Sequence, residues 1–230
     1  ITSSTGLTNN EGIWRSLVAA DIDNDGDADL IAGNLGLNNK YGVDFLHPLK
    51  LFSVDIDNNG SPDPVICYYI LTKNGQRKLL PGLSLSQLAE QVPSIKKKFL
   101  YHIDYSKAEI FDVIGNVKSE KILELNCFEI RSCWFENIGN GKFVKHVLPI
   151  EAQFAPVNAL LIKDFNDDGI MDILIGGNEY QTEVMTGRYD ASYGLLLKGK
   201  GNKIFKATTL QESGFITSGD CRDLKIINRF

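Results

Sequence analysis

The chain has 230 residues, 43% of them hydrophobic, which suits one large or two small globular domains and excludes an extensively disordered protein. No apolar run reaches the roughly 18 residues that a transmembrane helix needs, so we expect no transmembrane segment. The net charge of −5 comes from three acidic loops, which hold 12 of the 29 acidic residues and no Lys or Arg, so we read it as metal-ligand charge rather than as a field that repels nucleic acid. We expect no nucleic-acid partner.

The first of these loops is residues 21–29, DIDNDGDAD, between the β-branched runs SLVAA and LIAGN. Oxygen donors stand at positions 1, 3, 5 and 9, and Gly26 at position 6 lets the backbone turn sharply. Side chains spaced in this way can converge on one point. Calcium takes six to eight oxygen ligands in an adaptable shell, so the pattern indicates a calcium site.

The same pattern recurs at residues 55–63 (DIDNNGSPD) and 164–172 (DFNDDGIMD). Position 7 includes an isoleucine, so we expect that position to contribute its backbone carbonyl. We expect about three calcium ions, with the following candidate ligands: Asp21, Asp23, Asp25, Asp27, Asp29, Asp55, Asp57, Asn59, Ser61, Asp63, Asp164, Asn166, Asp168, Ile170 and Asp172. The first loop offers the most carboxylates and is expected to bind most tightly.

These loops are not EF-hands, because position 12 is Ala32, Ile66 or Ile175 rather than glutamate, and the flanks are strand-like. Each loop should therefore join two antiparallel strands. The alternative is a turn rich in Asp, Asn and Gly that binds nothing. Three copies with the same donor positions favour the metal site. Position 2 is always apolar (Ile22, Ile56, Phe165), and we expect it to anchor each loop in a core.

Residues 72–120 differ from the rest because LSLSQLAEQVPSIKKKF and YSKAEIFDVI have helical spacing. We expect a small helical insertion of two or three short helices, broken at Pro93. The run Lys96–Lys98 could face an anionic ligand, but a solvated helix end is the commoner meaning of such a run.

Further hairpins complete the β pattern: SCWFENIGNGKFVKHVL turns at residues 137–141, and YGLLLKGKGNKIFKAT turns at residues 199–202. Two hairpins in series form a four-stranded unit, as in a β-propeller blade. We expect an all-β partial propeller of about three to four blades: residues 14–71, the outer part of a second blade at 122–148, and residues 157–208. The tail FITSGDCRDLKII is similar to the first strands of another blade.

A second polar cluster lies in GNEYQTEVMTGRYDASYG, where carboxylates, tyrosines and an arginine alternate. Loops between strands often carry ligand sites, so Glu183, Arg188, Tyr189 and Asp190 are candidate residues for binding a glycan or a protein. The alternative is an internal ion-pair network in which Arg188 forms a bidentate pair with a carboxylate.

No catalytic motif is present, and His47, His102 and His146 lie in unrelated contexts. The four cysteines lack metal-type spacing and are expected to be free thiols, with disulfides as the alternative. Calcium sites of this kind fill where calcium is millimolar, so we expect an extracytoplasmic location: secreted, periplasmic or at the cell surface.

The loop D-x-D-x-D-G-x-x-D between strands, followed by a G-N-G-x-F hairpin, resembles the FG-GAP/VCBS repeats of integrin-α-like propellers, and the whole chain is similar to bacterial VCBS-repeat proteins. The resemblance implies a propeller with calcium in its hairpins, which this chain does not close alone, so it is expected to be part of a longer chain or an oligomer. The function expected is a non-catalytic module that binds a glycan or a protein. The alternative is a propeller-type polysaccharide lyase that uses calcium.

Overall fold

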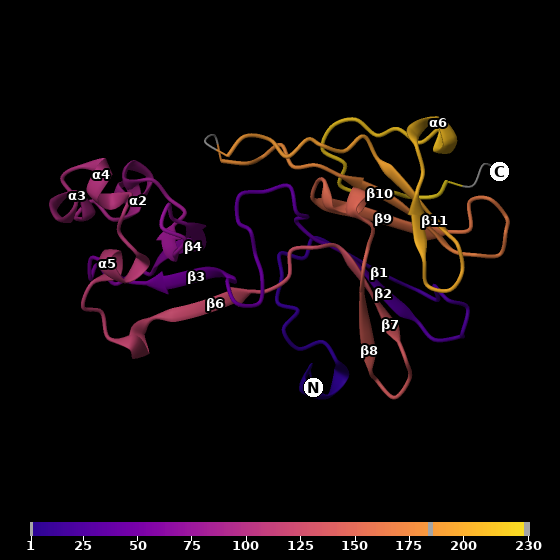
Figure 1. The fold of residues 1–230 in the computed structure, drawn as a ribbon, viewed down its shortest axis with the longest axis horizontal. Coiled ribbons are helices and arrows are strands. Elements are labelled where there is room, and N and C mark those ends of the chain that lie inside the picture. Colours follow the sequence, from indigo (N-terminus) through magenta and orange to yellow (C-terminus); the bar gives the residue numbers. More distant parts are fainter. Residues whose placement is uncertain (1, 184–185, 228–230) are drawn as a thin grey trace. The chain divides into compact units, whose positions relative to one another are not determined.

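The computed structural model describes residues 2–183 and 186–227 and contains three four-stranded antiparallel sheets joined by short helices and turns (Figure 1). The expectation of a mainly antiparallel β protein is confirmed. The chain divides into two compact units. The first unit comprises residues 1–39 and 129–230, and the second unit comprises residues 40–128.

The first sheet of the first unit contains two hairpins that are far apart in the sequence. Its strands, in spatial order, are β1 (Ser16–Ala20), β2 (Asp29–Gly33), β7 (Cys133–Asn137) and β8 (Phe143–Val147). The prediction that residues 14–71 form one sheet is wrong, and so is the assignment of 122–148 to a second one. Strand β2 pairs with β7, placing Ile31 opposite Trp134, and the intervening chain builds a unit of its own.

The second sheet of the first unit is a simple meander, as predicted for residues 157–208. Its strands are β9 (Val157–Lys163), β10 (Asp172–Gly177), β11 (Leu195–Gly199) and β12 (Phe205–Ala207). Short helical segments flank the sheets: α1 (Thr2–Thr5), the 3-10 turn Ile150–Gln153 and α6 (Leu210–Ser213).

The two sheets of the first unit pack face to face. Side chains from both sheets form one core, which includes Ile22, Ile31, Trp134, Leu148, Val157, Leu160, Ile173, Ile175 and Leu197. The sheets approach so closely that a Cβ on Gly33 would lie 2.3 Å from the carbonyl oxygen of Val157. Fully burying a large aliphatic side chain contributes about 1.5–3 kcal/mol, so this shared core is the main source of the unit's stability.

The second unit combines one sheet with a layer of short helices. Its elements are β3 (Leu49–Val54), β4 (Asp63–Leu71), β5 (Arg77–Pro81), α2 (Leu85–Gln91), α3 (Ile95–Lys98), α4 (His102–Tyr105), α5 (Ile110–Ile114), the 3-10 turn Ser119–Lys121 and β6 (Leu123–Cys127). The sheet order is β5-β4-β3-β6. The helices fall within the predicted stretch 72–120, but β5 also lies there, which was not expected.

One face of this sheet and the helices share a single core. Phe52 and Val65 from the sheet pack with Leu88, Ile110 and Val113 from the helices. Helix α2 begins at a capping box, in which the Ser84 hydroxyl accepts from the Gln87 amide and the Gln87 side chain accepts from the Ser84 amide. Because strands and helices have one core, the inserted unit has wider bounds than the helical stretch alone.

The tail at residues 215–227 forms no strand within the described part of the chain. It nevertheless repeats a contact between the two sheets. The Cys221 amide donates to the Gly177 carbonyl at 2.9 Å, just as the Val157 amide donates to the Asn34 carbonyl at 2.9 Å. Cys67, Cys133 and Cys221 are free thiols, and the first two of them are buried. Among the described helices, none is long and apolar enough to cross a membrane.

Candidate metal centre

The three acidic loops adopt the same local structure, and the carboxylate at position 1 organises it. In the first loop the Asp21 carboxylate accepts from the amides of Asp25 (3.1 Å) and Gly26 (3.0 Å). Asp55 accepts from the amides of Asn59 and Gly60, both at 2.9 Å, and Asp164 from those of Asp168 (3.2 Å) and Gly169 (2.7 Å). Loops in both units therefore fold around the same hydrogen bonds.

Two residues with positive φ make this turn possible. Position 4 lies in the left-handed region, with φ of 60° at Asn24, 58° at Asn58 and 56° at Asp167. Asn and Asp tolerate this conformation better than other non-glycine residues. Glycine follows at position 6, with φ of 93° at Gly26. At positions 4 and 6, where most side chains would strain the backbone, the sequence thus has residues that tolerate positive φ.

Position 9 is a buried aspartate in every copy: Asp29, Asp63 and Asp172. Its Oδ2 accepts from the position-2 amide at 3.0, 2.9 and 3.1 Å, respectively, which closes the loop. In the first unit the other oxygen also accepts from the neighbouring strand: Asp29 Oδ1 from the Asn137 amide at 2.7 Å, and Asp172 Oδ1 from the Gly199 amide at 2.9 Å. These aspartates connect the loops to the sheets.

Carboxylates converge in two of the loops. Asp21, Asp23 and Asp29 each offer an oxygen within 4.8 Å of the others, and so do Asp55, Asp57 and Asp63. The third loop has an amide, Asn166, at the corresponding position 3. A set of carboxylate oxygens around one point is the donor set that a hard cation such as calcium prefers.

Two physical signs show that the first loop has unbalanced negative charge. The Oδ1 atom of Asp23 is buried and accepts no hydrogen bond from the described residues. The pKa of Asp29 is raised, mainly by burial and also by the nearby charges of Asp23 and Asp25; burial and the same kind of crowding raise the pKa of Asp63. A bound cation would satisfy the buried oxygen and relieve the repulsion, so the residues present fit calcium.

Positions 5 and 7 interact with each other in every copy. The position-7 amides of Asp27, Ser61 and Ile170 donate to the side chains of Asp25, Asn59 and Asp168 at 2.9, 2.8 and 2.9 Å. One position-5 oxygen is used in this way, and the other oxygen of Asp168 accepts from the Asn166 side chain at 2.9 Å. That position 7 supplies a carbonyl ligand stays a prediction.

The expected anchoring at position 2 is confirmed for two loops and wrong for the third. Ile22 is buried between the two sheets, and Ile56 packs against the core of the second unit. Phe165 is 39% exposed and lines a pocket of about 420 Å³ with Leu174 and Phe215. Phe165 lies on the outer face of its sheet, where no further sheet of the described chain packs.

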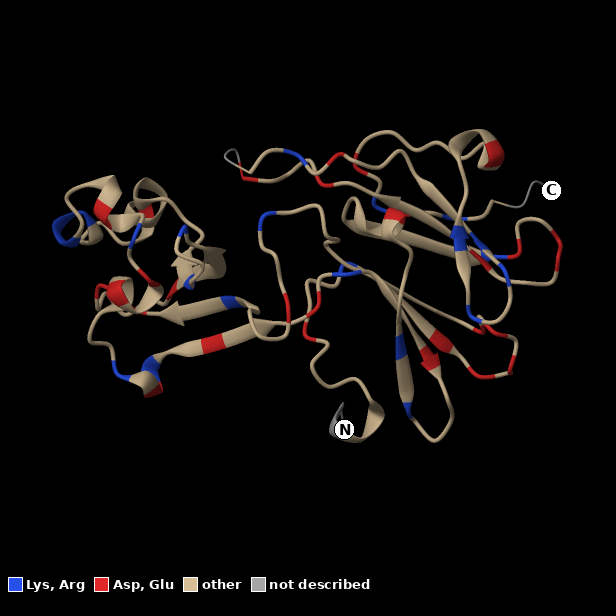
Figure 2. Ribbon diagram, viewed as in Figure 1, with Lys and Arg blue, Asp and Glu red and all other residues tan. Residues whose placement is uncertain are grey.

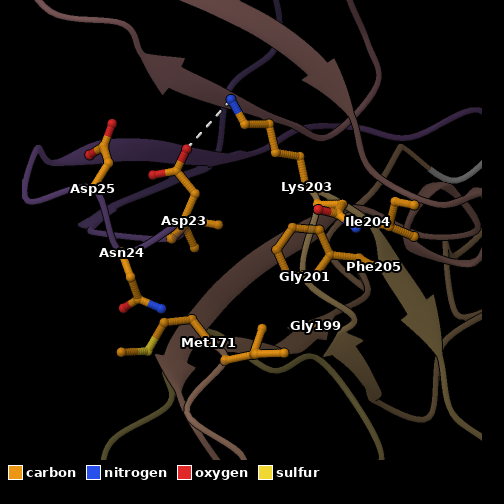
Figure 3. Close-up of a pocket in the computed structure, with 12 residues that line it drawn as sticks. Asp23, Asn24, Asp25, Met171, Gly199, Gly201, Lys203, Ile204 and Phe205 are labelled. Atoms are coloured by element: carbon orange, nitrogen blue, oxygen red, sulfur yellow. Dashed lines mark ion pairs between the residues drawn. The ribbon is translucent and has the colours of Figure 1, made fainter.

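The loops of the first unit lie at one end of the packed sheets, where Figure 2 shows acidic residues at the tips of the β1–β2 and β9–β10 hairpins. The Asn24 side chain donates to the Gly169 carbonyl at 3.2 Å, which joins the two loops. A pocket of about 370 Å³ opens between the first loop and the β11–β12 turn, and Lys203 from that turn points toward Asp23 (Figure 3), with Nζ 3.6 Å from Oδ2.

Sequence reasoning missed the role of Lys203. This lysine also pairs with Glu136, which in turn contacts His146 Nε2 at 2.8 Å. His146 stacks on Trp134 with 4.5 Å between ring centroids, so it is a packing residue. The hydrogen bond from Lys203 lowers the pKa of Glu136, and that from His146 adds to the effect. No local motif predicts this cluster, since its members come from hairpins far apart in the sequence.

The predicted polar cluster lies at the opposite end of the sheets and is only partly assembled. Glu183 contacts Thr186, Tyr189 pairs through its backbone with Glu179, and Asp190 is exposed. Arg188 stacks over the Tyr180 ring at 4.7 Å and forms no ion pair with any described residue. The alternative of a bidentate Arg188 pair is therefore wrong for the described residues. Val184 and Met185, which belong to the same stretch, lie outside them.

An internal network does exist there, but other arginines form it. Arg15 and Arg222 each pair with Glu179 at 2.7 Å, and Arg222 also pairs with Asp220 at 2.6 Å. The hydrogen bond from Arg222, assisted by that from Arg15, outweighs burial and lowers the pKa of Glu179 to about 2. Arg15 precedes β1 and Arg222 lies in the tail, so sequence spacing gives no signal for this network.

No family model, curated protein or solved structure shows significant similarity to this chain.

Proposed function

We propose that this protein is a non-catalytic, calcium-binding module of the FG-GAP/VCBS type that acts outside the cytosol and binds a glycan or a protein. The observation that carries this proposal is the threefold repetition of one loop structure. In all three copies position 1 accepts from the amides of positions 5 and 6, position 5 from the amide of position 7, and position 9 from the amide of position 2. Only two of these copies share a unit. A turn that served only to reverse the chain would not need to keep all of its oxygen donors.

The sheets of the first unit support the propeller part of the proposal. Each has four antiparallel strands, and they pack face to face like neighbouring blades. The hydrogen bond from the Cys221 amide to the Gly177 carbonyl repeats the one that links the first sheet to the second. The tail therefore begins where a third blade would begin, and we propose that further blades come from a longer chain or an oligomer.

Calcium is proposed to bind in order of ligand charge. The first loop has carboxylates at all four side-chain positions, and the position-9 carboxylate is held through both oxygens. Each of the other two loops offers three carboxylates and one amide. Extracellular calcium modules bind with dissociation constants of about 10⁻⁴–10⁻³ M, which suits the proposed compartment.

Isothermal titration with calcium and with magnesium tests the proposal. We expect calcium to bind more tightly, because magnesium demands octahedral geometry and gives up its water reluctantly. Asp25→Ala should weaken the tightest step and Asp168→Ala a weaker one. Magnesium binding as tight as calcium, or no heat with either ion, would refute the calcium assignment.

The ligand is tested separately with a glycan array, developed with calcium and again with chelator. The proposal expects binding that depends on calcium-loaded protein. Turnover of a polysaccharide into unsaturated products under the same conditions would instead indicate a lyase.

A further inference from the structure

The tip of the second unit, defined as residues 95–107 and comprising α3, α4 and the turn between them, carries concentrated positive charge. Lys96, Lys97 and Lys98 are consecutive and exposed, Lys107 is also exposed, and the only acidic residue in the tip is Asp104. Figure 2 shows the three consecutive lysines as a continuous blue turn on α3. The calcium loops account for none of this charge.

Large apolar side chains protrude from the same tip. Leu100 is 76% exposed, Tyr101 67% and Ile103 59%. They lie within seven residues of the first lysine of the run. Single exposed apolar residues are normal in proteins, but three neighbouring ones beside a lysine run mark an interaction site.

Buried neighbours hold these protruding side chains in place. Ile95 and Tyr105 are buried in the core of the second unit, and the Tyr105 hydroxyl donates to the Leu83 carbonyl at 2.9 Å. Phe99 packs edge-on against Tyr105, with 5.4 Å between ring centroids. The tip therefore alternates between residues that anchor it and residues that project from it. Leu100, Tyr101 and Ile103 are presented by a fixed support.

We propose that this tip binds the surface of membranes that contain anionic phospholipids. The lysines would lie near the lipid phosphates, and each lysine close to such a surface strengthens binding about fivefold. Leu100 and Ile103 would enter the boundary between headgroups and acyl chains, with Tyr101 at headgroup level, as aromatic residues are in membrane proteins. A soluble polyanion explains the lysines but gives the aliphatic side chains nothing apolar to contact.

This binding is independent of the proposed calcium function, because no tip residue belongs to an acidic loop. It is therefore expected both with calcium and with chelator, at a temperature where circular dichroism shows the protein folded. Calcium bridging between acidic loops and lipid phosphates would instead disappear with chelator. The two proposals can thus fail separately.

Co-sedimentation of the full chain with vesicles is the test. We expect binding to mixed phosphatidylcholine–phosphatidylglycerol vesicles and little binding to pure phosphatidylcholine. Lys96→Gln/Lys97→Gln should weaken binding about 25-fold at low salt. Lys98 is left intact because its Nζ donates to the Val113 carbonyl at 3.4 Å. Leu100→Ser/Ile103→Ser should weaken binding about tenfold or more, with less dependence on salt.

Matched controls come from the same unit. Lys73→Gln/Lys118→Gln removes two exposed lysines, and Leu71→Ser/Leu123→Ser removes two aliphatic side chains of 64% and 56% exposure. Both controls should bind like the parent protein. Equal binding to both kinds of vesicle, or equal losses in tip and control variants, would overturn the proposal. Loss with the lysine variant alone, together with competition by heparin, would assign the tip to a soluble polyanion instead.

Discussion

The first and second acidic loops have the same internal hydrogen bonds but different surroundings. The first loop lies in a unit built from two sheets packed face to face, and the second in a unit where one sheet packs against helices. In both loops, the position-1 carboxylate accepts hydrogen bonds from amides of the turn, and the position-9 carboxylate accepts one from the position-2 amide, which closes the loop. The loop is therefore a local structure that its nine residues determine, whatever packs around it.

The two loops differ in how position 9 connects to the sheet. Asp29 accepts from its own loop and from the Asn137 amide on β7, whereas Asp63 accepts from Ile56 alone among the described residues. The reason is the sheet register. Strand β5 pairs with residues 67–71 of the long strand β4 and does not reach the loop end. The first loop should thus be coupled more strongly to its unit.

Two tryptophans allow this comparison to be tested unit by unit. Trp14 and Trp134 both lie in the first unit, and residues 40–128 contain none. Tryptophan fluorescence therefore follows the first unit, and hydrogen-exchange mass spectrometry follows peptides of the second.

Calcium removal should give the largest difference between the units. Each site at a hundredfold excess of calcium over its dissociation constant adds about 2.7 kcal/mol to the free energy of unfolding. The first unit has two loops and the second has one, so excess chelator should destabilise the first unit about twice as much. Unfolding followed by fluorescence and by hydrogen exchange, with and without calcium, measures both effects. Equal destabilisation of the two units would contradict the assignment of one ion to each loop.

Position 9 provides the next largest contrast, measured without metal. Asp29→Ala leaves the Ile22 and Asn137 amides without an acceptor, and we expect a loss of about 3–4 kcal/mol in the first unit. Asp63→Ala affects only the Ile56 amide and should cost the second unit about 1–2 kcal/mol. Urea unfolding of both variants gives the comparison. A larger loss for Asp63→Ala would show that connection to the neighbouring strand is unimportant.

Acid should weaken the first unit through Glu129. Burial alone would raise the pKa of Glu129, but hydrogen bonds from Arg131 and Lys145 outweigh it and lower the pKa to about 2. A carboxylate with a lowered pKa stabilises the fold above its unfolded pKa, and this contribution is lost as the pH falls from about 4.5 toward 2. The full contribution is on the order of 3 kcal/mol. In the Glu129→Gln variant, the free energy of unfolding measured by fluorescence should fall less steeply between about pH 4.5 and pH 2 than in the parent protein. The same pH dependence in both proteins would contradict this role of Glu129.

The smallest effect concerns the polar end of the first unit. Arg188 stacks on Tyr180 at an exposed position, so Arg188→Ala should change stability by less than about 1 kcal/mol. Arg15→Ala, the matched variant, removes a charged partner of the mostly buried Glu179 and should cost about 2 kcal/mol. If Arg188→Ala proves the more costly, Arg188 belongs to the internal network after all. A stable Arg188→Ala protein that loses a glycan or protein ligand would identify the ligand site.

The sequence predicts local structure far better than the pairing of distant strands. The Asp, Asn and Gly positions of each loop dictate its turn, and the meander of residues 157–208 follows because consecutive strands pair. Pairing of β2 with β7 could not be foreseen, since nothing in SLVAA or LIAGN shows that residues 40–128 fold as a separate unit. Likewise, Arg15, Glu179 and Arg222 meet only because two sheets and the tail come together.

The exposure of Phe165 has a related cause. Its sequence position is equivalent to that of Ile22, but what covers position 2 is a neighbouring sheet rather than the loop itself. A pattern of nine residues carries no information about that neighbour. Local patterns thus predict the turn of each loop, and the contacts around the loop require the structure.

Equilibrium dialysis with calcium tests the central claim, that three copies of one loop bind three ions, most directly. The parent protein should bind three calcium ions per chain. Asp21→Ala, Asp55→Ala and Asp164→Ala should each reduce this to two, because position 1 organises its own loop and no other. Fewer than one ion bound by the parent protein, or a single variant that abolishes all binding, would contradict the account.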